Sequence, residues 1–204
     1  MRRCLAYCRA EATVIDLGAP FQAQGGSANF NCRTVTLSSM QLGTSGGEYS
    51  GTVIADGLIT VLQNLNFYAG SLQGTSQALA SCFATSLSLS LSHNNLLRCT
   101  GRGRTQVLGS VVFSTLTGKA IDAHTLQLSG PSSSWTSGSI AMSSGASLIV
   151  DPASTLTITT DGSITGSTLT GQVINYGTIS QVAGAMSGAS IGTSVVNYGT
   201  STRS

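Results

Sequence analysis

The chain has few charged residues, few aromatic residues and no long apolar run. Only 8% of its 204 residues are charged, against roughly a quarter in an ordinary soluble domain. No stretch approaches the ~18 consecutive apolar residues of a membrane-spanning helix, so we expect no membrane insertion. Nucleic-acid binding is not expected either, because it requires a stripe of basic residues and the chain has nine Lys and Arg in all.

The residues that replace the missing charges are small and hydroxylated. Ser, Thr and Gly supply about two-fifths of the chain, and from Thr125 to Thr202 the only charged residues are Asp151 and Asp161. The hydrophobic fraction is nevertheless 41%, which is too high for a disordered polar chain. We therefore expect a folded protein that solvates its surface mainly with hydroxyl groups.

Cysteine and histidine do not form a recognisable metal motif, and we expect no metal and no cofactor. The odd number of cysteines leaves at least one unpaired in a secreted chain, and both a buried thiol and an incidental disulfide stay open. The two histidines, His93 and His124, lack ligand spacing and are interpreted as surface or loop residues. The five cysteines all lie in the first half: Cys4, Cys8, Cys32, Cys82 and Cys99.

Two segments depart from the pattern of the rest. Residues 1–30 show no repeat and are interpreted either as a cap of the solenoid or as a non-authentic start, and Met1 to Ala12 lacks the apolar run of a signal peptide. Either the protein is cytoplasmic or the start of a secreted protein lies elsewhere. Residues 92–105 form the one basic patch, interpreted as an irregular loop or as a wrongly assigned stretch of reading frame. The repeat domain is assigned to residues 31–204.

Short apolar clusters separated by Gly, Asn, Asp or Ser dominate the chain. Thr155 to Thr159 alternates strictly between Thr and an apolar residue, as in a strand with one buried face. Two six-residue segments, Val173 to Thr178 and Val195 to Thr200, share Asn-Tyr-Gly-Thr at an offset of 22 residues. A repeat of this length fits one coil of a β-solenoid, whose inner face is buried only by stacking on the next coil.

The sequence therefore predicts an all-β, right-handed parallel β-solenoid with about 20–22 residues per coil, built on strands spaced about 4.8 Å apart. In this register Asn175 stacks on Asn197 and Tyr176 on Tyr198. Gly177 and Gly199 complete a turn ladder, because Asn and Gly both tolerate left-handed backbone angles. The apolar members of the alternating strands are expected to point inward: Ile140, Leu148, Val150, Leu156, Ile158, Ile164, Leu169, Val173, Ile179, Ile191 and Val195. Trp135 is expected to fill or cap the core rather than to stack on a sugar.

The run from Lys119 to Thr200 resembles the repeat segments of large surface β-helix proteins of the bacterial adhesin type. The resemblance rests on Trp135 to Ile140, Gly145 to Val150, Val173 to Ile179 and Val195 to Thr200. It covers about two-fifths of the chain and implies a long, exported protein of many similar coils. It also implies a location outside the cell or at its surface.

Two other functions stay open beside a structural or adhesive repeat segment. β-Helices also include polysaccharide lyases and glycosidases, which need two carboxyl groups about 5–10 Å apart. Asp122, Asp151 and Asp161 are the candidates, although Asp151 and Asp161 also suit ordinary turns. No catalytic motif is present, so an enzyme is not the favoured interpretation. The chain could instead be a fragment without independent function. Expected partners are carbohydrate or other surface proteins, together with copies of the chain stacked end to end through open strand edges.

Overall fold

A computed structural model describes residues 15–16, 20–31, 34–74, 103–166, 171–182 and 190–203. Within these ranges the chain is all-β and contains 23 strands that form three parallel sheets. None of the described residues forms a helix that is long and apolar enough to cross a membrane. The predicted fold class, a parallel β-solenoid, is confirmed.

Each coil contributes one strand to each sheet, in the order sheet 1, sheet 2, sheet 3. Sheet 1 comprises β1 (Ile15–Asp16), β4 (Val35–Leu37), β7 (Leu58–Val61), β10 (Gly103–Val107), β13 (His124–Leu128), β16 (Ala146–Val150), β19 (Gly171–Asn175) and β22 (Ser194–Asn197). Sheet 2 comprises β2 (Phe21–Ala23), β5 (Met40–Leu42), β8 (Asn64–Phe67), β11 (Ser110–Phe113), β14 (Ser132–Trp135), β17 (Thr155–Ile158), β20 (Thr178–Gln181) and β23 (Thr200–Arg203). Sheet 3 comprises β3 (Gly26–Asn31), β6 (Gly51–Ala55), β9 (Gly70–Gln73), β12 (Lys119–Asp122), β15 (Ile140–Ser143), β18 (Ser163–Thr165) and β21 (Ser190–Gly192).

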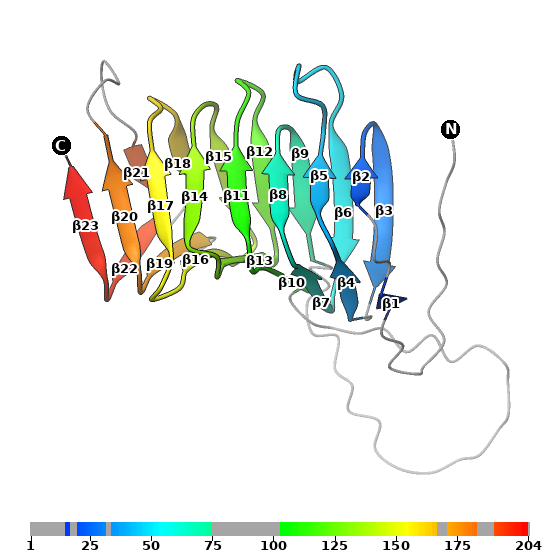
Figure 1. Cartoon of the computed structure of the whole chain (residues 1–204). Helices are drawn as coiled ribbons and strands as arrows, with labels where there is room; N and C mark the ends of the chain where they lie inside the picture. The colour runs from blue at the N-terminus through cyan, green and yellow to red at the C-terminus, as the bar shows by residue number, and fades with distance from the viewer. Residues whose placement is uncertain are drawn as a thin grey trace, which may run out of the picture.

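The coils stack side by side, so that like strands of successive coils lie next to one another (Figure 1). In sheet 1 the paired residues Thr105, Leu126, Leu148, Val173 and Val195 mark successive coils. Their separations are 21, 22, 25 and 22 residues (126 − 105, 148 − 126, 173 − 148, 195 − 173). The 22-residue repeat therefore measures one coil, although some coils are longer: 24 residues separate Val35 from Ile59 (59 − 35), and 25 separate Leu148 from Val173.

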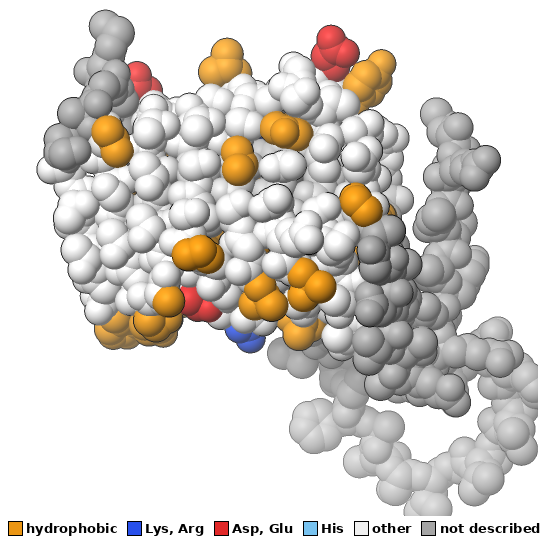
Figure 2. Space-filling view, in the orientation of Figure 1, with side chains coloured by type: hydrophobic (Ala, Val, Ile, Leu, Met, Phe, Trp, Pro, Cys, Tyr) orange, Lys and Arg blue, Asp and Glu red, His pale blue; other side chains and the backbone are white. Residues whose placement is uncertain are grey.

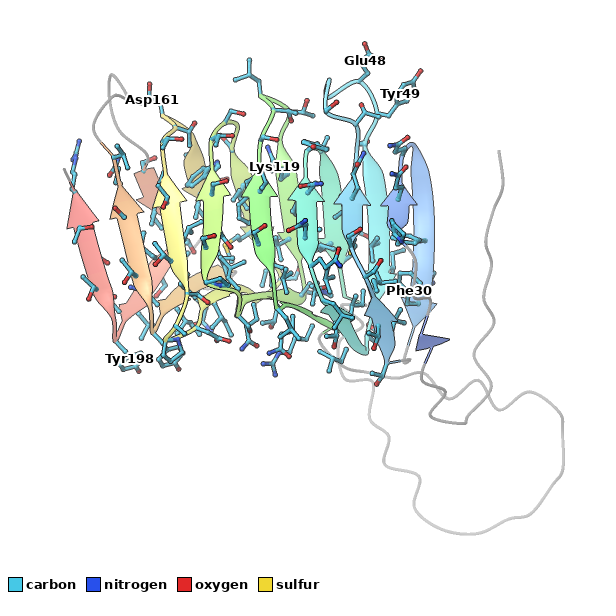
Figure 3. All side chains as sticks on the ribbon, in the orientation of Figure 1. Phe30, Glu48, Tyr49, Lys119, Asp161 and Tyr198 are labelled. Atoms are coloured by element: carbon cyan, nitrogen blue, oxygen red, sulfur yellow. The ribbon has the colours of Figure 1, made fainter. Side chains whose placement is uncertain are left out.

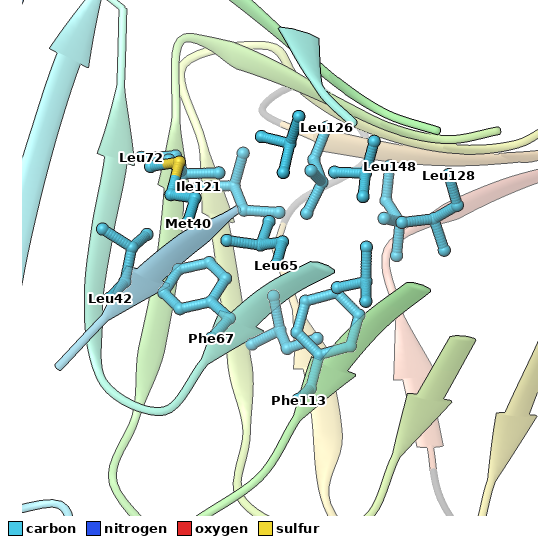
Figure 4. Packing of buried hydrophobic residues seen from close by; sticks show 14 of the residues in the cluster. Met40, Leu42, Leu65, Phe67, Leu72, Phe113, Ile121, Leu126, Leu128 and Leu148 are labelled. Atoms are coloured by element: carbon cyan, nitrogen blue, oxygen red, sulfur yellow. The ribbon is translucent and has the colours of Figure 1, made fainter. Parts of the chain in front are cut away.

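Strict alternation places one apolar column of each sheet inside the stack. In β17 the buried residues Leu156 and Ile158 alternate with the half-buried Thr155 and Thr157. The apolar side chains of successive coils meet in one continuous core, which includes Phe67, Phe113 and several leucines (Figure 4). Trp135 is fully buried and its Nε1 donates a hydrogen bond to the Gly138 carbonyl at 2.9 Å. Its predicted core role is confirmed.

Most of the predicted core residues are buried, with three exceptions. Ile191 is only partly buried, although it packs against the core. Val195 pairs with the buried Val173 and so points inward as predicted, but it is 45% exposed. It lies on the last described coil, and no described coil covers its side chain. Leu169 lies outside the described residues.

The first coil begins earlier than the sequence pattern indicated. Strands β2 and β3 already pair in sheets 2 and 3, so the boundary expected at residue 30 falls inside the first coil. β3 reads Gly-Ser-Ala-Asn-Phe-Asn, which has too few apolar residues for alternation to reveal it. In the basic segment, residues 103–105 lie in β10, and residues 92–102 lie outside the described residues. All five cysteines and His93 also lie outside the described residues.

The described residues that flank 75–102, Gly74 and Gly103, lie next to each other at one corner of the stack. Gly74 occupies the same corner position as Ala123 one coil later, because Gln73 pairs with Asp122 and Gly103 pairs with His124. A Cβ on Gly74 would lie 3.2 Å from the Gly103 nitrogen. Gly74 and Gly103 therefore form this corner of the coil together, as Asp122, Ala123 and His124 do in the next coil.

Candidate functional site

One corner of the solenoid, between sheets 1 and 2, presents one side chain per coil at the same position. The backbone N–H of each of these residues donates to a carbonyl of the preceding coil at 2.7–3.0 Å, so their spacing is fixed by the strand ladder. We call this set the corner column: Leu62, Leu108, Ser129, Asp151, Tyr176 and Tyr198. Figure 3 labels one member of this column, Tyr198, at the lower edge of the stack.

The C-terminal part of the corner column is aromatic. The rings of Tyr176 and Tyr198 stack with centroids 5.1 Å apart and an interplanar angle of 9°. They are 44% and 69% exposed. The predicted stacking of these two tyrosines is confirmed. Because one ring covers the other, the pair presents its edges and the outer face of Tyr198 to solvent.

An amide pair, of which Asn175 is buried and Asn197 exposed, adjoins the tyrosines. Asn175 pairs with Asn197, as predicted, and its Nδ2 donates to Asn197 Oδ1 at 2.7 Å and to the Thr200 carbonyl at 3.0 Å. Asn175 is fully buried, and its Oδ1 has no hydrogen-bond partner among the described atoms. In the preceding coil this inward position holds Val150, which has no donor to offer. The asparagine ladder thus begins at Asn175.

The glycines of the turn ladder are required for a different reason than the sequence suggested. Neither Gly177 nor Gly199 has a positive φ. Instead, a Cβ on Gly177 would lie 2.2 Å from the Asp151 carbonyl oxygen, and one on Gly199 would lie 2.1 Å from the Gly177 carbonyl oxygen. Any side chain here would collide with the backbone of the previous coil.

The centre of the corner column is polar and internally hydrogen-bonded. Gln127 Nε2 donates to both carboxylate oxygens of Asp151 at 2.7–2.8 Å, and Ser129 Oγ donates to the same carboxylate. Gln106 Nε2 donates to Ser129 Oγ at 3.0 Å, and Arg104 donates to Gln127. These contacts connect three successive coils and hold the polar side chains in fixed orientations.

The three candidate carboxylates lie at three different corners. Asp122 ends β12 beside the corner of sheets 3 and 1, where Ser143 Oγ donates to it at 2.7 Å. Asp151 belongs to the corner column. Asp161 is exposed in the turn between β17 and β18, at the upper edge in Figure 3. The structure therefore does not bring these three residues together into one site of the kind that glycoside hydrolysis uses.

His124 is buried, so its interpretation as a surface or loop residue is wrong. The imidazole is fully enclosed beside Gly103 and pairs with Thr105 Oγ1 through Nε2 at 2.9 Å. Gly103 and Ala146 occupy the same inward position in the neighbouring coils, and their small size leaves room for the ring. Burial lowers the pKa of His124 from 6.5 to about 4, against an opposing hydrogen-bond effect of Ala55.

Lys119 is a buried cation that no sequence pattern predicted. Its Nζ donates to the carbonyls of Thr115, Thr117 and Ser137 at 3.0–3.3 Å. Burial lowers the pKa of Lys119 to about 8. Thr115 has a φ of 74°, in the left-handed region, and the three carbonyls fix this turn around the ammonium group. We assign Lys119 a structural role at the corner of sheets 2 and 3.

No group of three or more His, Cys, Asp or Glu side chains among the described residues could hold a metal ion. Comparison with known proteins found no matching family model, no similar curated protein and no similar solved structure. The fold and the corner column are thus the observations from which function is inferred.

Proposed function

We propose that the chain is a structural and adhesive segment of a cell-surface or secreted protein, located outside the cell. The observation that supports this proposal is the corner column, which presents apolar, polar and aromatic side chains at one-coil intervals on a continuous strand ladder. A ladder of this kind orders its side chains before any partner arrives, which reduces the entropy lost on binding. No step of chemistry is needed for such a role.

The partner that suits the corner column is carbohydrate or another surface protein. Tyr176 and Tyr198 supply exposed aromatic area, while Arg104 and Asp151, both held in place by the buried Gln127, supply oriented polar groups on neighbouring coils. Aromatic residues and arginine are the types that contribute most to binding at protein surfaces.

Solid-phase binding tests this proposal. The purified chain is applied to surfaces coated with chitin, mannan, collagen or fibronectin, and retention is compared with that of a Tyr176→Ser/Tyr198→Ser double variant. Tyr49→Ser is the matched control, because Tyr49 is also exposed but lies in the loop between β5 and β6, at another corner. We expect the wild type and the control to be retained on at least one coating and the double variant to be lost. Equal retention of the double variant, or no retention on any coating, would contradict the proposal.

The proposal includes association of chains end to end. The outer edges of β22 and β23 have no paired strand among the described residues, and the inward side chain of Val195 is exposed there. Unpaired strand edges offer backbone donors and acceptors to another chain. The low charge of the chain supplies little repulsion against such contacts.

A further inference from the structure

The outer face of sheet 2 carries a regular array of hydroxyl groups in its C-terminal half. The strands β14, β17, β20 and β23 have two outward positions each, and Ser or Thr occupies every one of them. The register aligns these positions in two straight columns. The first column is Ser132, Thr155, Thr178 and Thr200, and the second is Ser134, Thr157, Ser180 and Thr202.

The array has two fixed repeat distances. Neighbouring strands lie about 4.8 Å apart, and alternate residues of one strand lie about 6.6 Å apart. Both distances are of the size of the oxygen–oxygen repeats on the surfaces of hexagonal ice. Five of the eight residues are threonines, whose branched side chains have restricted χ1 angles. The hydroxyl and methyl groups are therefore held in a lattice by the backbone and by their own rotamers.

The array is also neutral. None of its eight side chains carries a charge, and the centre of this face shows neither acidic nor basic colouring in Figure 2. An uncharged face of this kind is suited to an uncharged partner surface, such as a lattice of water molecules. Charged groups would instead organise water around themselves and disturb a continuous lattice.

The other two faces of the same coils lack such an array. The outward positions of sheet 1 include Gln127, Ile149 and Ile174, which differ in size and polarity. Those of sheet 3 include Asp122 and Ala141. The hydroxyl array is therefore particular to sheet 2, although hydroxyl residues are abundant throughout the chain.

We propose that the outer face of β14, β17, β20 and β23 binds the surface of ice. The threonine and serine hydroxyls hold a layer of water at the repeat distances of the crystal, and the threonine methyl groups confine that layer from the sides. This layer merges with the growing crystal face, so the bound protein restrains further growth. The inference does not depend on the adhesive role of the corner column, which lies along an edge of this sheet.

The test is ice shaping and thermal hysteresis, the gap between the melting and freezing temperatures, measured on the purified full chain. Thr157→Tyr places a bulky ring at an outward position within the array. Thr125→Tyr makes the same change at a half-buried, outward threonine of sheet 1 and is the matched control. Circular dichroism and thermal unfolding establish that each variant is folded. If Thr157→Tyr does not fold, Ser180→Tyr replaces it.

We expect ice shaping and hysteresis from the wild type and from Thr125→Tyr, and loss of both from Thr157→Tyr. Absence of activity in the wild type would overturn the proposal. So would equal activity of Thr157→Tyr, or equal loss in both variants. Retention on crystalline cellulose or chitin that Thr157→Tyr abolishes, without any effect on ice, would assign the array to a crystalline polysaccharide and would also overturn it. The tyrosine variants of the corner column should leave ice activity unchanged, which separates this result from the adhesion assay.

Discussion

The stability of the chain should fall as the pH drops through the range in which His124 titrates. In the folded protein the imidazole is fully buried, and burial lowers its pKa from 6.5 to about 4. The unfolded chain therefore binds a proton at this residue at a higher pH than the folded chain does. The contribution of the neutral ring to the free energy of unfolding is fully present above pH 6.5, and it is lost progressively as the pH falls towards 4.

The size of the effect follows from the two pKa values. One pKa unit corresponds to about 1.4 kcal/mol, so a shift of about 2.5 units corresponds to about 3 kcal/mol in total. At pH 5 the unfolded chain is almost fully protonated at this residue and the folded chain is mostly neutral. The loss at pH 5 relative to neutral pH is then about 2 kcal/mol.

Guanidinium unfolding at pH 7 and pH 5 measures this loss. The control is His124→Gln, which removes the titrating group and keeps a polar side chain beside Thr105. The other titrating groups are shared by both proteins, so their contributions cancel in the difference. We expect the wild type to lose about 2 kcal/mol more than the variant between the two pH values. Equal losses in the two proteins would show that the imidazole is not held neutral by burial.

Three further predictions follow from the stacking. Leu156→Ala should lower the free energy of unfolding by about 2–5 kcal/mol, because it leaves a cavity inside a coil, whereas Thr157→Ala on the outer face should change it little; equal effects in denaturant melts would mean that the alternation faces the other way. Removing residues 75–102 and joining Gly74 to Gly103 should leave a folded chain with the same type of β-sheet circular dichroism, because the two glycines already meet at a one-residue corner; loss of the cooperative melt would disprove this. Purified chains should associate as their concentration rises, as followed by light scattering, and a monodisperse monomer at high concentration would count against end-to-end contacts.

The sequence predicted those parts of the fold that repeat locally. Alternation in Thr155 to Thr159 correctly placed Leu156 and Ile158 inside, and the two Asn-Tyr-Gly-Thr segments correctly predicted which residues stack. These signals work because inward and outward positions alternate with a period of two and because coils of equal length bring like residues together. At Val195 the inward direction was also correct, but an inward side chain is buried only where a further coil covers it, and no described coil covers Val195.

The buried polar residues could not be predicted in this way. Lys119 is satisfied by three backbone carbonyls, which carry no mark in the amino-acid sequence. His124 fits inside because Gly103 and Ala146, each about a coil away, are small. The corner on which each candidate carboxylate lies, and the alignment of the hydroxyls on one face, depend on the register of all the coils together.

The most direct test of the coil register is solution NMR on the isotopically labelled chain. In-register parallel stacking places the backbone of Val173 beside Val195, and that of Thr157 beside Ser180, at the spacing of neighbouring strands, about 4.8 Å. We expect cross-strand nuclear Overhauser effects within each of these pairs, and between the side-chain amides of Asn175 and Asn197. Cross-strand contacts in an antiparallel pattern, or contacts of Asn175 with a residue other than Asn197 at this position, would contradict the parallel β-solenoid.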